Sequence, residues 1–233
     1  MKNIKGFINF LKNSHLSLVL FAEIIIGIIV SLASMYLFLK IGHEIIENDI
    51  LLIDLTITNF ILEFRNPTLD SIMLLFTSLA SGISLILLSL IMILYIGNVR
   101  KKDVGIYLGI LYSGILVNIL LKFLYMRPRP DNLPLIHENS LSFPSAHAMN
   151  SFLFFAALSY FIFRETKNKQ LTIVISLISA TLIGLIGISR IYLGVHYPSD
   201  VIGGFIAGFL WFTSAILFEK TIIFKRLYKS SKK

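Results

Sequence analysis

Three short polar clusters interrupt an otherwise apolar sequence of 233 residues, and their side chains could carry out chemistry together. The clusters occupy residues 122–130, 144–147 and 189–200. They supply lysine, arginine, histidine and aspartate, which are the groups needed to bind a phosphate and to transfer it. Each cluster alone is weak evidence, but their order and spacing indicate one shared phosphate site.

The candidate phosphate ligands are basic side chains in the first and third clusters. Lys122, Arg129 and Arg190 could direct N–H donors at one phosphate, and an arginine fork can hold two oxygens at once. Arg127 competes with Arg129 for this role, because both stand in the sequence RPRP. For Lys122 alone, the simpler interpretation is an interfacial lysine whose ammonium reaches the membrane surface.

The second cluster, PSAH, leads directly into a long apolar run. We therefore expect Ser145 or a neighbour to cap a helix whose first N–H groups and positive dipole end could hold a phosphate. His147 then falls in the first turn of that helix. A lone histidine at a helix end is usually only an interfacial residue, so His147 gains weight through the other clusters.

The third cluster contains a histidine and a carboxylate four residues apart, His196 and Asp200. If a helix opens near Pro198, the carboxylate can accept a hydrogen bond from one ring nitrogen and fix the tautomer. The other nitrogen is then available as a nucleophile or base. The simpler alternative is that Ser199 or Asp200 only caps the helix.

The elements that must position these clusters are membrane helices. With 56% hydrophobic and 15% charged residues, the chain departs far from soluble globular composition. Its unbroken apolar runs favour helices over barrel strands. The six runs cover residues 16–39, 71–96, 104–121, 148–163, 171–188 and 201–218. We therefore expect an all-α bundle of six transmembrane helices, in which the short fourth and fifth runs extend into flanking residues.

The net charge of +8 carries topological information. Lysines and arginines gather in the N-terminal tail, at residues 100–102 and 164–169, and in the tail from residue 220. With six helices these segments fall on one side, which the positive-inside rule makes cytoplasmic. Both termini are then cytoplasmic, and the polar clusters face the outside of the cytoplasmic membrane. This distribution argues against nucleic acid as a partner, and the absence of cysteine excludes disulfides and thiolate metal sites.

The connections between the runs also carry predictions. Residues 44–67 mix apolar and acidic side chains, so we expect an outer amphipathic helix along the interface, with an irregular loop as the alternative. The proline-rich stretch 125–143 should be a shaped, non-helical loop. Glu23 is a candidate functional residue, because it is an ionisable side chain inside the first apolar run. Gly204 and Gly208 indicate a close helix contact.

The three clusters resemble the three-part signature of the type 2 phosphatidic acid phosphatase superfamily. The match reads Lys122-x6-Arg129-Pro130, then Pro144-Ser145-x-His147, then Ser189-Arg190-x5-His196-x3-Asp200. It covers residues 122–200, and its spacing selects Arg129 over Arg127. The family commonly has glycine where this chain has Ala146. Alanine keeps its backbone N–H, but a positive φ there would be strained.

The resemblance implies a mechanism that needs neither metal nor cofactor. His196, supported by Asp200, would attack phosphorus to give a phosphohistidine, and His147 would protonate the leaving oxygen. The phosphate ligands would be Lys122, Arg129, Arg190, Ser145 and the backbone at Ala146.

The resemblance also implies a substrate class and a cellular place. Residues 1–233 would form a single membrane-embedded phosphatase domain whose partners are the bilayer and a phosphorylated lipid. The preferred substrate is undecaprenyl diphosphate, and the alternative is phosphatidylglycerol phosphate or phosphatidic acid. A transporter or a non-catalytic lipid-binding protein is the alternative of a different class. The polar residues lie at helix ends rather than at mid-span, which argues against a transporter.

Overall fold

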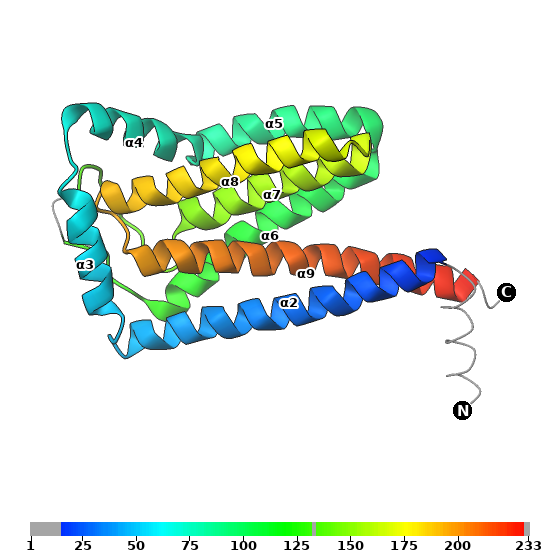
Figure 1. Ribbon diagram of the computed structural model, residues 1–233, viewed down its shortest axis with the longest axis horizontal. Coiled ribbons are helices and arrows are strands. Elements are labelled where there is room, and N and C mark those ends of the chain that lie inside the picture. The colour runs from blue at the N-terminus through cyan, green and yellow to red at the C-terminus, as the bar shows by residue number, and fades with distance from the viewer. Residues whose placement is uncertain (1–14, 132–133, 231–233) are drawn as a thin grey trace.

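The computed structural model describes residues 15–131 and 134–230, and this part of the chain is helical without strands. Its helices are α2 (His15–Ile46), α3 (Leu51–Leu62), α4 (Pro67–Leu79), α5 (Gly82–Val99), α6 (Lys101–Tyr125), α7 (Ala146–Thr166), α8 (Lys169–Tyr192) and α9 (Pro198–Ser230). All except α3 run along the long axis of the bundle (Figure 1). Five of them are each long and apolar enough to cross a membrane, and α4 with α5 makes a sixth span if the bent pair crosses as one. The expected all-α membrane bundle is confirmed.

The second span is not the single straight helix that its apolar run predicts. It divides into α4 and α5, which are bent by 51° at the break. Ser81 causes the new start, because its hydroxyl accepts a hydrogen bond from the Ser84 N–H at 3.3 Å and caps α5. Hydropathy does not register this interruption, since serine and glycine leave the run apolar on average.

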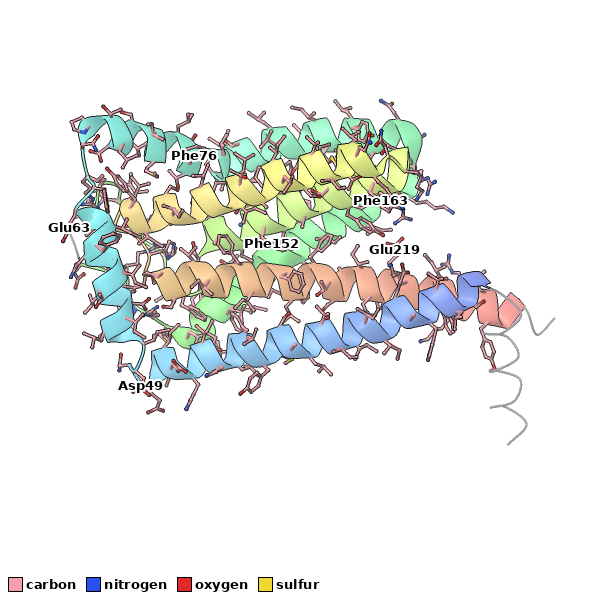
Figure 2. The ribbon with its side chains drawn as sticks, viewed as in Figure 1. Asp49, Glu63, Phe76, Phe152, Phe163 and Glu219 are labelled. Carbon is pink, nitrogen blue, oxygen red and sulfur yellow. The ribbon has the colours of Figure 1, made fainter. Side chains whose placement is uncertain are left out.

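The helix between the first two spans is α3, which lies across one end of the bundle (Figure 1). Asp49 and Glu63 mark its two ends in Figure 2. The apolar side chains of Leu52 and Phe60 are exposed, whereas the polar side chains of Asp54 and Thr58 are buried. The helix therefore turns its polar face into the protein and leaves an apolar face that suits the membrane interface.

The most deeply buried helix is α7, which packs against α8, α9 and α6. Gly204 and Gly208 allow the close approach of α9. A Cβ at Gly204 would lie 2.7 Å from the Ser145 carbonyl oxygen, and one at Gly208 would lie 3.1 Å from that of Met149. The predicted close helix contact is confirmed, and it joins α9 to the first turns of α7.

Glu23 has a structural partner at the far end of the bundle. Its carboxylate lies 2.8 Å from the Lys220 ammonium, which joins the first half of α2 to the last part of α9. These segments lie at the end opposite α3 (Figure 1). The three polar clusters lie at the α3 end, so the ion pair accounts for Glu23 without a role in their chemistry.

Candidate active site

The predicted site residues come together at the end of the bundle that carries α3. Lys122 stands near the end of α6, His147 at the start of α7, Arg190 near the end of α8, and Asp200 at the start of α9. Residues 126–131 and 134–145 are non-helical, as predicted for the stretch 125–143 apart from Tyr125, which ends α6, and they lie at the same end (Figure 1). Helix ends and one loop, rather than any mid-span position, therefore build the site.

His196 is buried with its two ring nitrogens facing different partners. Nε2 lies 3.1 Å from a guanidinium nitrogen of Arg129. Nδ1 lies 3.2 Å from the Ser142 hydroxyl and 3.5 Å from the Asp200 carboxylate. Because arginine can only donate, Nε2 must present its lone pair and the proton must reside on Nδ1. This is the tautomer that a nucleophilic Nε2 requires.

The charge state of His196 also suits a nucleophile. Burial disfavours the imidazolium and lowers the pKa of His196 to about 3, although the Asp200 carboxylate opposes the shift. The ring is therefore neutral near pH 7. A neutral imidazole keeps the lone pair that attack on phosphorus needs.

Arg129 is held by the loop that surrounds it. Its guanidinium donates to the carbonyl oxygens of Ser140 and Val195, both at 2.6 Å, and to the Ser140 hydroxyl at 2.8 Å. Lys122 is buried and donates to the carbonyl oxygens of Leu141 and Ser142. The interpretation of Lys122 as a lysine reaching the membrane surface is thus wrong, because its ammonium is turned into the loop.

Arg190 is the most deeply buried of the expected cations, at 1% exposure. It donates to the Thr77 hydroxyl at 2.7 Å and to the Glu138 carboxylate at 2.5 Å, while its Nε has no hydrogen-bond partner among the described residues. Glu138 also lies 3.9 Å from Arg129. Burial alone would raise the pKa of Glu138, but Arg190 and Arg129 outweigh it and lower that pKa. A carboxylate therefore bridges two cations predicted to bind phosphate.

The start of α7 has the expected cap. Ser145 precedes the helix, and its hydroxyl accepts a long hydrogen bond of 3.5 Å from the Ala148 N–H. Ala146 is the first helical residue, and the described non-glycine residues with positive φ are Asn48, Met126 and Lys167. The strain considered for alanine at this position therefore does not arise.

Asp200 is fully buried, and its carboxylate has hydrogen-bond donors on both oxygens besides its contact with His196. One oxygen accepts from the Ser142 hydroxyl at 2.5 Å and from the Tyr197 N–H at 2.8 Å. The other accepts from Arg127 at 2.6 Å. Of the two arginines in RPRP, Arg129 contacts His196. Sequence reasoning missed that Arg127 binds the carboxylate partner of that histidine.

The other missed residues are Asp54, Thr77, Glu138 and Ser142. Asp54 was visible as an acid inside an apolar segment, and it accepts from Arg127 at 2.7 Å. Thr77, Glu138 and Ser142 carry no local signal, because their partners lie on other elements of the fold.

An apolar cavity of about 440 Å³ opens beside His147. Its lining includes His147 and Asn150 of α7, and its walls come mainly from α5 and α6. The wall residues include Leu85, Ile86, Leu90, Ile93, Leu108, Leu111 and Ile115. A hydrocarbon chain would find matching surroundings directly beside the predicted acid.

The membrane-length helices bring buried cations and a neutral histidine together at one end of the bundle. This arrangement is typical of a membrane protein that binds a phosphate group. Comparison with known proteins agrees with this class. Residues 103–224 match the PAP2 superfamily model. Phosphatidylglycerophosphatase B of Bacillus subtilis is 36% identical over 192 residues, covering 79% of this chain and 92% of that protein. The chain belongs to the PAP2 superfamily.

Two further comparisons support this assignment. Undecaprenyl-diphosphatase BcrC of Bacillus subtilis is 30% identical over 181 residues, covering 72% of this chain and 87% of that protein. The crystal structure of a transmembrane PAP2 type phosphatidylglycerolphosphate phosphatase from Bacillus subtilis superposes with a TM-score of 0.78 at 32% identity, covering 82% of this chain and 96% of that one. The chain is thus a multi-pass membrane hydrolase of phosphate esters, as predicted.

Proposed function

We propose that this protein removes phosphate from a lipid through a phosphohistidine intermediate, without a metal ion. The observation that carries the proposal is the placement of His196. Its unprotonated Nε2 accepts a hydrogen bond from Arg129, and its protonated Nδ1 faces Ser142 and Asp200. In-line phosphoryl transfer needs a nucleophile with a fixed tautomer. It also needs a cation beside the nucleophile and a carboxylate behind it.

In the first step, Nε2 of His196 attacks phosphorus. A bond forms between this nitrogen and phosphorus while the bond to the lipid oxygen breaks. That oxygen takes a proton from His147 in its imidazolium form, which the negative charge of the bound phosphate favours. Lys122, Arg129 and Arg190 stabilise the negative charge of the transferring group. These side chains take the charge-neutralising role that a divalent metal has in other phosphatases. Ser145 and the backbone N–H at Ala146 complete the proposed phosphate contacts.

In the second step, water attacks phosphorus and the nitrogen–phosphorus bond breaks. His147, now neutral, accepts a proton from that water and returns to its initial state. Inorganic phosphate leaves, and His196 regains its lone pair. Asp200 stabilises the positive charge that the ring of His196 carries between the two steps.

The apolar cavity supports a lipid substrate. Its lining includes His147, the proposed proton donor to the leaving oxygen, and its walls are mainly apolar side chains of α5 and α6. Our preferred substrate is undecaprenyl diphosphate. Phosphatidylglycerol phosphate has equal support from the relatives, since one is a phosphatidylglycerophosphatase and another an undecaprenyl-diphosphatase. Phosphatidic acid is the third candidate.

Phosphate release from these three lipids in detergent tests the function. We expect wild-type protein to release phosphate and His196→Ala to release none. His137→Ala is the matched control, because His137 is an exposed histidine of the outer loop. Full activity in His196→Ala would remove the nucleophile from the proposal. No release from any lipid by wild type would contradict the function itself.

The proposed topology places both termini in the cytoplasm and the site on the outer side. The basic segments 100–102 and 164–169 lie at the bundle end opposite α3 (Figure 1), whereas the N-terminal lysines lie outside the described residues. The native chain has no cysteine, so single cysteines can report topology. We expect an impermeant thiol reagent to label Asn139→Cys in intact cells and Gln170→Cys only after lysis. The reverse pattern would overturn the orientation.

A further inference from the structure

Behind Asp200 lies a buried charge network that extends to α3. Arg127 donates to Asp200 at 2.6 Å through one terminal nitrogen and to Asp54 at 2.7 Å through the other. Asp54 and Asp200 are 1% and 0% exposed, and Arg127 is 7% exposed. A planar guanidinium with two forked nitrogens is suited to joining two carboxylates in this way.

The same carboxylate of Asp54 organises the start of α9. It accepts from the Ser199 N–H at 2.9 Å and from the Ser199 hydroxyl at 2.5 Å. The Ser199 N–H belongs to the first turn of α9, where backbone donors lack partners within the helix. Asp54 thus caps, from α3, the helix that carries Asp200.

The charges in this network do not cancel. Two carboxylates share one guanidinium, so the three side chains Asp54, Arg127 and Asp200 carry a net charge of about −1 when all are ionised. A negative environment favours a positive charge on His196, and phosphoryl transfer to Nε2 puts such a charge on the ring. If residue 54 carried no charge, the positive charge of Arg127 would cancel the negative charge of Asp200. The positive charge on the His196 ring would then be stabilised less.

We propose that Asp54 and Arg127 are positioning residues that hold the Asp200 carboxylate at Nδ1 of His196 and keep its negative charge effective. This inference rests on the proposed phosphohistidine function. Neither residue is among the proposed phosphate ligands. Their action is through Asp200, so it appears in the chemical step rather than in lipid binding.

The decisive variant is Asp54→Asn, which removes the charge and keeps an amide oxygen that can accept the Ser199 N–H. We expect kcat to fall about 10- to 100-fold, the range seen when an orienting partner behind a reactive group is lost, with KM changed less than about threefold. In a single turnover, formation of phosphohistidine should slow by the same factor. Thr58→Val is the matched control, because Thr58 is buried one turn along α3 and its hydroxyl has no hydrogen-bond partner within residues 15–131 and 134–230. It should keep the wild-type kcat.

A second variant tests whether Asp54 acts through Arg127. Lysine is a point charge that cannot join two carboxylates as a fork does, so Arg127→Lys should also lower kcat. The double variant should lose no more than the stronger single variant. Multiplied losses in the double variant would refute the coupling, and so would wild-type kcat in Asp54→Asn or a change confined to KM. If wild type itself turns over no lipid, the proposed function fails instead.

Discussion

The contact between α9 and the start of α7 allows a sharp test of how the phosphate site is positioned. In Gly204→Ala, the new Cβ would lie 2.7 Å from the Ser145 carbonyl oxygen and 2.9 Å from the Ala148 Cβ. Ordinary contacts begin at 3.4 Å, so the start of α7 must move by about 0.7 Å. The backbone oxygen cannot rotate away as a side chain can.

The magnitude of the effect follows from this displacement. Overpacking of this kind costs about 1–3 kcal/mol of stability. A shift approaching 1 Å at a catalytic group can lower the rate about 100-fold. Because Ser145 and His147 stand at the displaced end, we expect kcat to fall about 10- to 100-fold and the melting temperature to decrease.

Gly184→Ala is the matched control, because it makes the same change in α8 where a Cβ meets nothing within 4 Å. Both variants gain the same helix propensity, about 1 kcal/mol, so their difference isolates the contact. Phosphate release from a short-chain lipid and thermal unfolding in detergent measure the two effects. Equal kcat in the two variants would refute the claim that this contact positions the site.

Three further predictions follow from the charges of the site. Glu138→Gln should lower the inhibition constant for inorganic phosphate several-fold, because Arg190 and Arg129 lose a competing carboxylate; an unchanged constant would contradict the competition. His196 is neutral in the folded protein down to a pKa of about 3, but it takes up a proton near pH 6.5 when unfolded. Its contribution to stability is therefore present above pH 6.5 and is lost as the pH falls toward 3, so the melting temperature should fall less steeply between pH 7 and 5 in His196→Asn than in wild type. Phosphate release should persist in EDTA, and its abolition would overturn the metal-free mechanism.

The sequence predicts much of the fold because a membrane helix follows from the hydrophobicity of one continuous segment. A run of apolar residues needs no tertiary partner to be recognised, so the six spans could be placed from composition and length. The bend at Ser81 was not predicted. It depends on one serine that caps a new helix inside an apolar run, which averaging over the run conceals.

The site divides in a similar way. His196, Asp200, Arg129 and Arg190 stand in spaced motifs, so sequence reasoning could group them. Asp54 could not be grouped with them, because its contact with Ser199 joins residues 145 positions apart and no periodicity connects them. Arg127 was recognised only as a rival of Arg129, since a carboxylate partner cannot be read from RPRP.

The contact between Asp54 and the start of α9 limits when the site can form during synthesis of the chain. At about 5–20 residues per second, the ribosome needs roughly 7–30 s to make the 145 residues that separate Asp54 from Ser199. Until this interval ends, Asp54 lacks the Ser199 N–H that it caps, and Arg127 can bind Asp54 but not Asp200. Activity should therefore arise only after the last helix has inserted, and a chain interrupted before it should reside in the membrane without acting on lipids.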